Sequence, residues 1–148
     1  MDEVVISHIR STHPKYGQVW DLREEILRKP LGRSLKNDNM DRDLVDTIFI
    51  AEHNNQVIGC VIAHHLDNDK IQLRAMAVYN DWQGKGIGRL LVKAAEEFSA
   101  QNGYSHIVLH ARKVVLGFYK SLGYEVSGDE FVEVGIPHFM MEKKVGYI

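Results

Sequence analysis

The stretch that most constrains the fold is Gln83-Gly84-Lys85-Gly86-Ile87-Gly88-Arg89, which holds three glycines within five residues. Residues 71–79 before it alternate in polarity, which predicts a β-strand. Apolar side chains after it recur with helical spacing, at Ile87, Leu90, Leu91, Ala94, Ala95 and Phe98. The chain order therefore predicts a strand, a glycine-rich turn and a helix that ends at Asn102-Gly103.

Such a turn has the properties of an anion-binding site. Glycines allow the backbone to approach a ligand closely, and the first N–H groups of the helix lack intrahelical partners. The positive end of the helix dipole lies at the same place, and Lys85 and Arg89 add positive charge beside it. We therefore expect a phosphate or pyrophosphate group to bind here.

Spacing separates this turn from two widespread phosphate-binding motifs. The P-loop requires Lys-Ser/Thr after its last glycine, and the dinucleotide fingerprint requires a glycine at position 89, where this chain has Arg89. Short glycine patterns also recur by chance, so an ordinary glycine-rich turn without a ligand is an alternative at this point.

The composition is that of a soluble globular protein, with 45% hydrophobic and 26% charged residues in 148 positions, and we expect one domain over residues 1–148. A net charge of −2 gives no electrostatic reason to expect nucleic acid or a membrane as a partner. Cys60 is the single cysteine and lies in an apolar run, which predicts a buried core residue. No stretch is long or apolar enough to span a membrane and Met1-Asp2-Glu3 does not start like a signal peptide, so we expect a cytoplasmic enzyme. We expect no metal, because no His/carboxylate spacing matches a known ligand pattern.

The remaining periodicity predicts an α/β protein with a mixed sheet and helices on both faces. A helix around residues 19–28 is expected to stop at Pro30, and residues 31–35 to form a short second helix or turn. A polar loop without periodicity follows at residues 36–43. The predicted order is β-α-α-β-β-β-α-β-α-β-β, with the other strands at 4–9, 47–52, 57–63, 105–111, from 124 and at 136–143, and a helix at 114–122.

Several stretches resemble the GNAT superfamily of acetyl-CoA-dependent N-acetyltransferases. Gln83, Gly86 and Gly88 match its pyrophosphate-binding motif, Gln/Arg-x-x-Gly-x-Gly/Ala. Residues 118–124, Phe-Tyr-Lys-Ser-Leu-Gly-Tyr, resemble its Phe-Tyr-x-x-x-Gly-Phe/Tyr signature, and the element order resembles the family's over nearly the whole chain. The closing segments 128–131 and 135–138 resemble the bacterial ElaA-like branch of this family.

The resemblance implies a central strand at residues 73–78 that splays from its neighbour, so that its free backbone groups pair with the pantetheine arm of acetyl-CoA. It implies Tyr119 as the catalytic acid, with a purely structural aromatic as the alternative. The Val78 N–H is expected to polarise the thioester carbonyl. The cofactor-binding residues implied are Met76, Ala77, Val78, Gln83, Gly84, Lys85, Gly86, Ile87, Gly88, Arg89, Arg112 and Phe118.

The chain departs from the family pattern at two places. Arg112 stands where many relatives have asparagine, and an arginine there is suited to a CoA phosphate. The central strand has Gln72 and Arg74 where many members carry a glutamate base, so no carboxylate base is apparent. His110 and His138 are candidates to line the acceptor site and to act as a base there, whereas a solvated edge is the simplest account of His53, His64 and His65.

These observations favour direct transfer of an acetyl group to a primary amine of a small molecule or protein, without a covalent enzyme intermediate. A non-catalytic acyl-CoA sensor and a nucleotide-binding regulatory domain are the rival hypotheses. Homodimers are common in the family that the chain resembles, but no sequence feature indicates one here.

Overall fold

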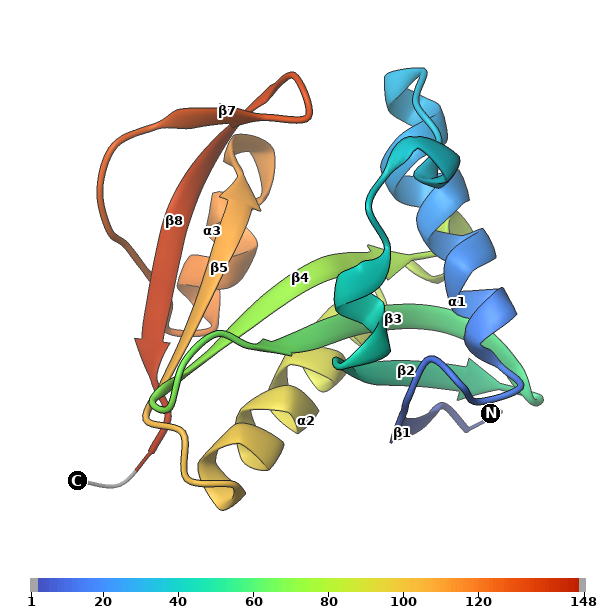
Figure 1. Ribbon diagram of the computed structural model, residues 1–148, viewed down its shortest axis with the longest axis horizontal. Coiled ribbons are helices and arrows are strands. Elements are labelled where there is room, and N and C mark those ends of the chain that lie inside the picture. Colours follow the sequence, from blue (N-terminus) through green and yellow to red (C-terminus); the bar gives the residue numbers. More distant parts are fainter. Residues whose placement is uncertain (1–2, 147–148) are drawn as a thin grey trace. The chain divides into compact units, whose positions relative to one another are not determined.

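The computed structural model describes residues 3–146 and shows a mixed α/β fold (Figure 1). Within that range the sheet has eight strands in the order β1-β2-β3-β4-β5-β8-β6, and β7 pairs with β8. The strands are β1 Val5–Ile9, β2 Thr47–His53, β3 Gln56–His65, β4 Lys70–Val78, β5 His106–Arg112, β6 Glu125–Val126, β7 Phe131–Glu133 and β8 Ile136–Lys144. The helices are α1 Tyr16–Arg23, α2 Ile87–Gln101 and α3 Leu116–Ser121. The predicted fold class is confirmed, and β7 is a strand that the sequence analysis did not predict.

The helical region after α1 differs in detail from the prediction. The chain continues as a π-helix, Glu24–Arg28, and then as a 3-10 turn, Lys29–Leu31, which contains Pro30 instead of stopping before it. Proline fits the start of such a turn because the N–H that it lacks would have no helical partner there. Gly32 ends the turn with a φ of 68°.

No second α-helix forms in the described chain between α1 and β2; 3-10 turns occur at Leu35–Asn37 and Asp41–Leu44 instead. The Glu24 carboxylate accepts hydrogen bonds from the Ser34 hydroxyl at 2.6 Å and from the Leu35 N–H at 2.8 Å. These two bonds lower the pKa of Glu24 below its usual value, and they give the Leu35 N–H a side-chain partner in place of a helical one.

The polar loop at residues 36–43 is anchored at its end by Asp43. This side chain is 2% exposed and accepts a hydrogen bond from Arg23 Nη1 at 2.7 Å and another from the Tyr16 hydroxyl. A buried carboxylate with two donors holds the loop against α1 more firmly than its polar sequence suggests.

The chain contacts define two compact units. Unit 1 comprises the residues up to His64 together with Ala75–Ala95, and unit 2 comprises His65–Arg74 and the residues from Glu96 onward. Strand β4 and helix α2 each contribute residues to both units.

Unit 1 is built on the β2–β3 hairpin, whose two-residue turn is Asn54-Asn55. Both asparagines have positive φ, 50° and 64°, which is the requirement of the tight turn that matches strand twist. The buried cluster around it includes Cys60, as predicted. Its buried members are Ile9, Val19, Leu22, Ile48, Ile50, Val57, Cys60, Ile62 and Ala77.

Helix α2 approaches the sheet of unit 1 at Gly59. A Cβ atom on Gly59 would lie 3.0 Å from Ile87 and 3.2 Å from Leu91, so glycine permits the close approach. Ile87, Leu91 and Ala95 are buried as the helical spacing predicted. The prediction was wrong for Leu90, which is 45% exposed, because the buried stripe is centred nearer Val92 and Ser99.

In unit 2, a polar network joins the end of α2 to α3 and β8. Tyr124 donates to Glu96 Oε2 at 2.8 Å, and Lys143 Nζ donates to Glu96 Oε1 at 3.1 Å and to the Leu122 carbonyl at 2.8 Å. Lys143 is also 5.6 Å from the centre of the Tyr124 ring. These charge-assisted bonds fix the C-terminal end of α3 beside β8.

The parallel pairing of β4 with β5 is short. Its register runs from Lys70↔His106 to Leu73↔Leu109, although β4 continues to Val78 and β5 to Arg112. Two residues beyond Leu73, Ala75 adopts a φ of 56°, which interrupts the regular strand geometry. The pairing that ends at Leu73 accords with the splayed central strand expected from the sequence.

The β7–β8 hairpin has a strained turn, and this yields a first prediction. Its two turn residues are Val134 (φ 46°) and Gly135 (φ 78°), and a β-branched residue is disfavoured at positive φ. We expect Val134→Asn to raise the free energy of unfolding by about 1 kcal/mol, because asparagine tolerates this conformation.

Urea denaturation measures this difference. The matched control is Val132→Asn, since Val132 is 72% exposed and lies in β7 itself. We expect the control to lower stability or leave it unchanged, because asparagine is a poor strand residue. Equal effects of the two substitutions would contradict the assignment of strain to Val134.

Candidate functional site

The glycine-rich turn leads directly into α2. Gly84 and Gly86 have φ values of 75° and 83°, and no atom lies within 4 Å of a Cβ built on either residue. Both glycines, together with Lys85 and Arg89, are exposed. The Leu90 N–H makes an early helical bond, to the Gly86 carbonyl at 3.1 Å, so the preceding N–H groups of the first turn are those that lack intrahelical acceptors. This geometry is suited to an oxyanion ligand.

Gln83 connects this turn to the end of β4. Its side-chain amide donates to the Val78 carbonyl at 2.8 Å and to Asn80 Oδ1 at 3.2 Å. Gln83 therefore shapes the turn from within, which is a second role beside the predicted contact with a cofactor.

Lys85 lies over an aromatic side chain that the sequence analysis passed over. Its Nζ is 5.9 Å from the centre of the Trp82 ring, and Trp82 in turn packs against His53 at 4.6 Å. A cation held over an indole keeps its position while it faces solvent. His53 therefore supports Trp82, which a merely solvated histidine would not do.

The last residues of β4 divide between core and surface. The side chain of Ala77 is 2% exposed and that of Ile87, at the start of α2, is 4% exposed, so a ligand can reach these two residues mainly through their backbone. Met76 and Val78 are partly exposed, as strand alternation requires. The Tyr79 N–H donates to the Ile58 carbonyl at 3.0 Å, which fixes the strand just after Val78.

Tyr119 lies on α3, in unit 2, and is 7% exposed. Its ring meets Phe118 edge-on at 4.9 Å and Tyr124 edge-on at 5.8 Å. Burial raises the pKa of Tyr119 to about 12, so the hydroxyl stays protonated and able to donate throughout the neutral range.

Tyr124 differs from Tyr119 because its hydroxyl is already engaged. Burial, and then the negative charge of Glu96 and the bond to it, raise the pKa of Tyr124 well above its usual value. The environment thus gives one tyrosine a structural partner and leaves the other as the better candidate donor.

Arg112 is the last residue of β5 and precedes a 3-10 turn, Lys113–Val115, that leads into α3. The predicted helix at 114–122 is therefore shorter than expected and begins only at Leu116. The side chain of Arg112 is partly exposed. In register, Arg112 lies opposite His138 of β8.

Unit 2 also brings together a histidine cluster at the β7 end of β8. His110 Nδ1 is 3.0 Å from Glu133 Oε1, and His138 Nε2 is 3.6 Å from Glu133 Oε2. The Phe131 ring lies edge-on to His110 at 5.0 Å and stacks on His138 at 5.8 Å. The sequence singled out both histidines but missed Glu133 and Phe131, because β7 was not predicted.

His64 has a partner that a solvated edge would not provide, so that account was wrong for it, whereas His65 is exposed as expected and contacts a tyrosine. His64 Nδ1 is 2.6 Å from Asp46 Oδ1, and the Asp46 side chain is 0% exposed. His65 Nδ1 is 2.5 Å from the Tyr104 hydroxyl. Both contacts join residues distant in sequence, which local patterns do not reveal.

The described part of the chain has neither a membrane-spanning helix nor a side-chain group arranged for a metal ion. Within residues 3–146, no helix combines the length and apolar character needed to cross a bilayer. No group of three or more His, Cys, Asp or Glu side chains in the same range is arranged to hold a metal ion.

The glycine-rich turn, the short β4–β5 pairing and the mixed sheet together define an acetyltransferase fold, and comparison with known proteins agrees. Residues 20–145 match the model of the acetyltransferase (GNAT) domain, so the chain belongs to this family. The Bacillus subtilis protein YyaT is 32% identical over 97 residues, which cover 66% of this chain and 65% of YyaT. The chain therefore matches just under two thirds of that relative.

Solved structures show the same fold. The crystal structure of Escherichia coli ElaA has a TM-score of 0.84 and 15% identity, and the match covers 95% of this chain and 99% of ElaA. A GNAT family acetyltransferase from Elizabethkingia anophelis with acetyl-CoA bound has a TM-score of 0.72 and 19% identity, covering 97% and 99% of the two chains. At these identities the likeness concerns the fold.

The raised pKa of Tyr119 yields a second prediction. The pKa of Tyr119 is 10.0 in the unfolded chain and about 12 in the folded one. The folding stability that this difference contributes is therefore complete below pH 10 and is lost as the pH rises towards 12. By pH 11 the wild type should lose about 1.4 kcal/mol of stability relative to Tyr119→Phe, which has no ionisable group there. Urea denaturation at pH 8 and pH 11 measures this; a pH-independent difference would contradict the raised pKa.

Proposed function

We propose that this protein is an acetyl-CoA-dependent N-acetyltransferase that transfers an acetyl group directly to a primary amine of a small molecule or protein. One observation carries the proposal: a GNAT-family chain opens α2 with two exposed left-handed glycines, Gly84 and Gly86. The structural relative from Elizabethkingia anophelis, which has acetyl-CoA bound, supports the choice of co-substrate.

The glycine-rich turn would hold the pyrophosphate of CoA. The backbone N–H groups from Gly84 to Arg89 supply donors, and Lys85 and Arg89 supply charge. Met76, Ala77 and Val78 would present backbone groups to the pantetheine amides, with Phe118 as an apolar contact. We assign Arg112 to a phosphate of CoA because a guanidinium binds phosphate in a bidentate manner.

The reaction forms a C–N bond and breaks a C–S bond. The nitrogen of a neutral amine attacks the thioester carbonyl, and the N–H of Val78 stabilises the negative charge that develops on the carbonyl oxygen. When the tetrahedral intermediate collapses, the electron pair of the C–S bond leaves with sulfur. Tyr119 donates its hydroxyl proton towards that sulfur.

The pKa of Tyr119 limits how far its proton moves. Full transfer of the proton from the Tyr119 phenol, of pKa about 12, to a thiolate whose thiol has a pKa of ~8.5 would be uphill by about 5 kcal/mol. Tyr119 therefore acts mainly as a hydrogen-bond donor to the departing sulfur. The proton that finally completes the CoA thiol is matched by one that the attacking nitrogen loses.

A third prediction tests the pyrophosphate cradle. Acetyl-CoA should raise the melting temperature, because a ligand that binds only the folded protein stabilises it. Gly86→Val should remove most of this shift, since its side chain would occupy the place of the pyrophosphate. Thermal denaturation with and without acetyl-CoA measures the shift for each variant against its own ligand-free state.

The matched control is Gly32→Val. Gly32 also lies in unit 1, has a φ of 68°, and has no atom within 4 Å of a built Cβ. Its substitution should cost similar stability through backbone strain and leave the acetyl-CoA shift intact. If Gly86→Val keeps the full shift, the turn is not the phosphate site.

A fourth prediction concerns Tyr119. Phenylalanine keeps the ring packing and removes only the donor, so Tyr119→Phe should fold and bind acetyl-CoA almost normally. Its turnover number should fall roughly 10²-fold or more, the scale expected for losing a positioned acid. Steady-state release of CoA in the presence of a panel of primary amines provides the measurement.

Tyr124→Phe makes the same change in the neighbouring ring. It should lower stability by about 1.5–3 kcal/mol, because the Glu96 carboxylate loses a hydrogen bond, but change turnover only a few-fold. A wild-type rate for Tyr119→Phe under conditions where chemistry is rate-limiting would assign Tyr119 to the core. Wild-type protein that binds acetyl-CoA but acetylates no amine would favour an acyl-CoA sensor.

A further inference from the structure

His110, Glu133 and His138 lie on one face of the unit 2 sheet. In the antiparallel register, His110 is opposite Met140 and Arg112 is opposite His138, while His138 is also opposite Phe131. Directly opposed residues share a face, and so do residues two apart along a strand. Glu133 follows Phe131 by two residues and therefore joins the same face.

The hydrogen bonds define which nitrogen of each histidine carries a proton. A carboxylate and a carbonyl can only accept, so His110 donates through Nδ1 to Glu133 at 3.0 Å, and His138 donates through Nδ1 to the Ile136 carbonyl at 2.9 Å. In the neutral form of His110, the lone pair is then on Nε2. A histidine oriented by a carboxylate through one nitrogen, with the other nitrogen basic, has the arrangement of a general base.

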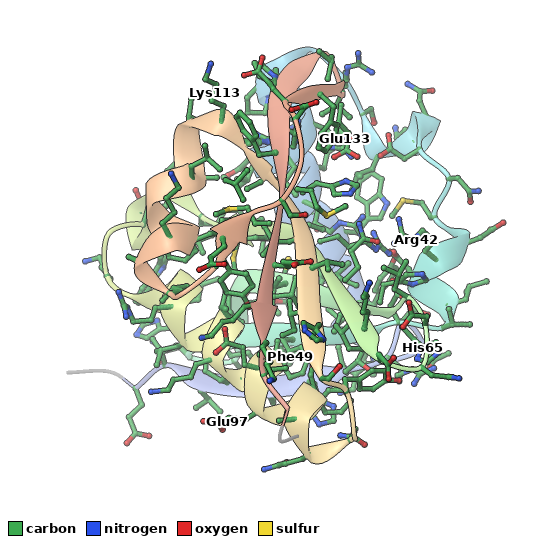
Figure 2. All side chains as sticks on the ribbon, turned by 90° about the vertical axis from the view of Figure 1, so that its left-hand side faces the viewer. Arg42, Phe49, His65, Glu97, Lys113 and Glu133 are labelled. Carbon is green, nitrogen blue, oxygen red and sulfur yellow. The ribbon has the colours of Figure 1, made fainter. Side chains whose placement is uncertain are left out.

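The helix that carries Tyr119 lies on the opposite face of this sheet. Lys143 is opposite Ile107, so strand alternation places it on the face away from His110. Lys143 bonds to the carbonyl of Leu122, at the end of α3, and lies over the ring of Tyr124, which Tyr119 contacts. Figure 2 shows the ribbon of α3 and the Lys113 side chain on one side of β8 and Glu133 on the other.

His110 also occupies a particular position along β5. Leu109 is the last residue of β5 in the register with β4, and His110 immediately follows it. Its ring is partly exposed, at 28% for the side chain, whereas the His138 side chain is 4% exposed. Of the two histidines, His110 is thus the one that a ligand can reach.

We propose that His110 is the general base of the acetyl transfer and that Glu133 is its positioning residue. The inference rests on the proposed function and deepens it by naming the group that makes the acceptor nucleophilic. The acceptor class is a primary alkylamine that arrives as an ammonium ion. The proton donor on α3 and the base on β5 then serve different atoms, the leaving sulfur and the attacking nitrogen.

The proton balance is simple. Nε2 of neutral His110 takes one proton from the ammonium ion, and the nitrogen lone pair released forms the C–N bond as the C–S bond breaks. The transfer makes one amide and one CoA thiol, and the imidazolium returns its proton to water. The charged or titratable groups on the face of His110 include Glu133 of β7, His138 and Glu142 of β8, Arg112 of its own strand, and Arg74, which follows Gln72 of β4 by two residues.

The fifth prediction compares His110→Gln with wild type on two amines. One is the primary alkylamine of a test panel that reacts fastest, and the other is its β,β,β-trifluorinated analogue, which is largely the neutral amine at pH 7. We expect kcat/KM for the alkylamine to fall about 10²- to 10⁴-fold at pH 7. For the fluorinated amine the loss should be below about tenfold, because that amine needs no base.

The pH profile gives a second readout. Wild-type kcat/KM for the alkylamine should level off within the neutral range because a protein base removes the proton, whereas in His110→Gln it should keep rising with pH in proportion to the neutral fraction of the amine. The matched control is His106→Gln, at the far end of the same strand, where His106 contacts Ser105. The control should keep both the rate and the profile of the wild type.

Glu133 is tested by graded substitution. Gln can still accept the bond from Nδ1 of His110, whereas Ala cannot, so Glu133→Gln should retain more kcat/KM than Glu133→Ala while KM for acetyl-CoA stays unchanged. Equal loss with both amines in His110→Gln, or a pH profile for the alkylamine that is unchanged from wild type, would overturn the assignment of His110. Wild-type protein inactive towards every amine would instead overturn the proposed function, and the base with it.

Discussion

The parallel pairing between β4 and β5 lasts for only four residue pairs, and Val78 and His110, which we propose for the chemistry, both lie beyond the point where it stops. Backbone N–H and C=O groups beyond Leu73 and Leu109 need other partners, because buried polar groups left unpaired are costly. Ala75, with its left-handed φ, turns the rest of β4 out of regular strand geometry. Val78 lies at the end of that segment, and His110 begins the corresponding segment of β5. An extended ligand with amide groups suits such a backbone.

Residues of the same type lie in different environments in this structure, and these environments suit them to different roles. Tyr119 and Tyr124 are neighbours in the same aromatic cluster, but only Tyr124 has a carboxylate within hydrogen-bond distance at its hydroxyl among the described contacts. His110 and His138 share Glu133, yet His138 is enclosed while His110 is partly exposed. In each pair the buried or engaged member supports the geometry, and its neighbour is the one proposed to take part in the chemistry.

The features that the sequence predicted are those that local residue types determine. The glycine-rich turn, the Asn54-Asn55 hairpin and the long helix all follow from residues within a few positions of one another. The bond between His110 and Glu133 joins residues 23 positions apart and depends on strand register. The 3-10 turns after α1 depend likewise on Glu24, which captures the Leu35 N–H from 11 positions away. Such long-range side-chain bonds override local propensity.

The two-residue turn at Val134-Gly135 has a consequence for how this protein can diverge. Strand pairing has a period of two, so inserting one residue into the turn would move Glu133 and Phe131 to the other face of the hairpin while His138 stayed in place. Substitutions that keep the turn at two residues leave Glu133, Phe131 and His138 on the same face. Homologues that keep the His110–Glu133 pair should therefore vary in the identity of these turn residues but conserve their number, and an alignment gap at this position would mark a lineage that has lost the proposed base pair.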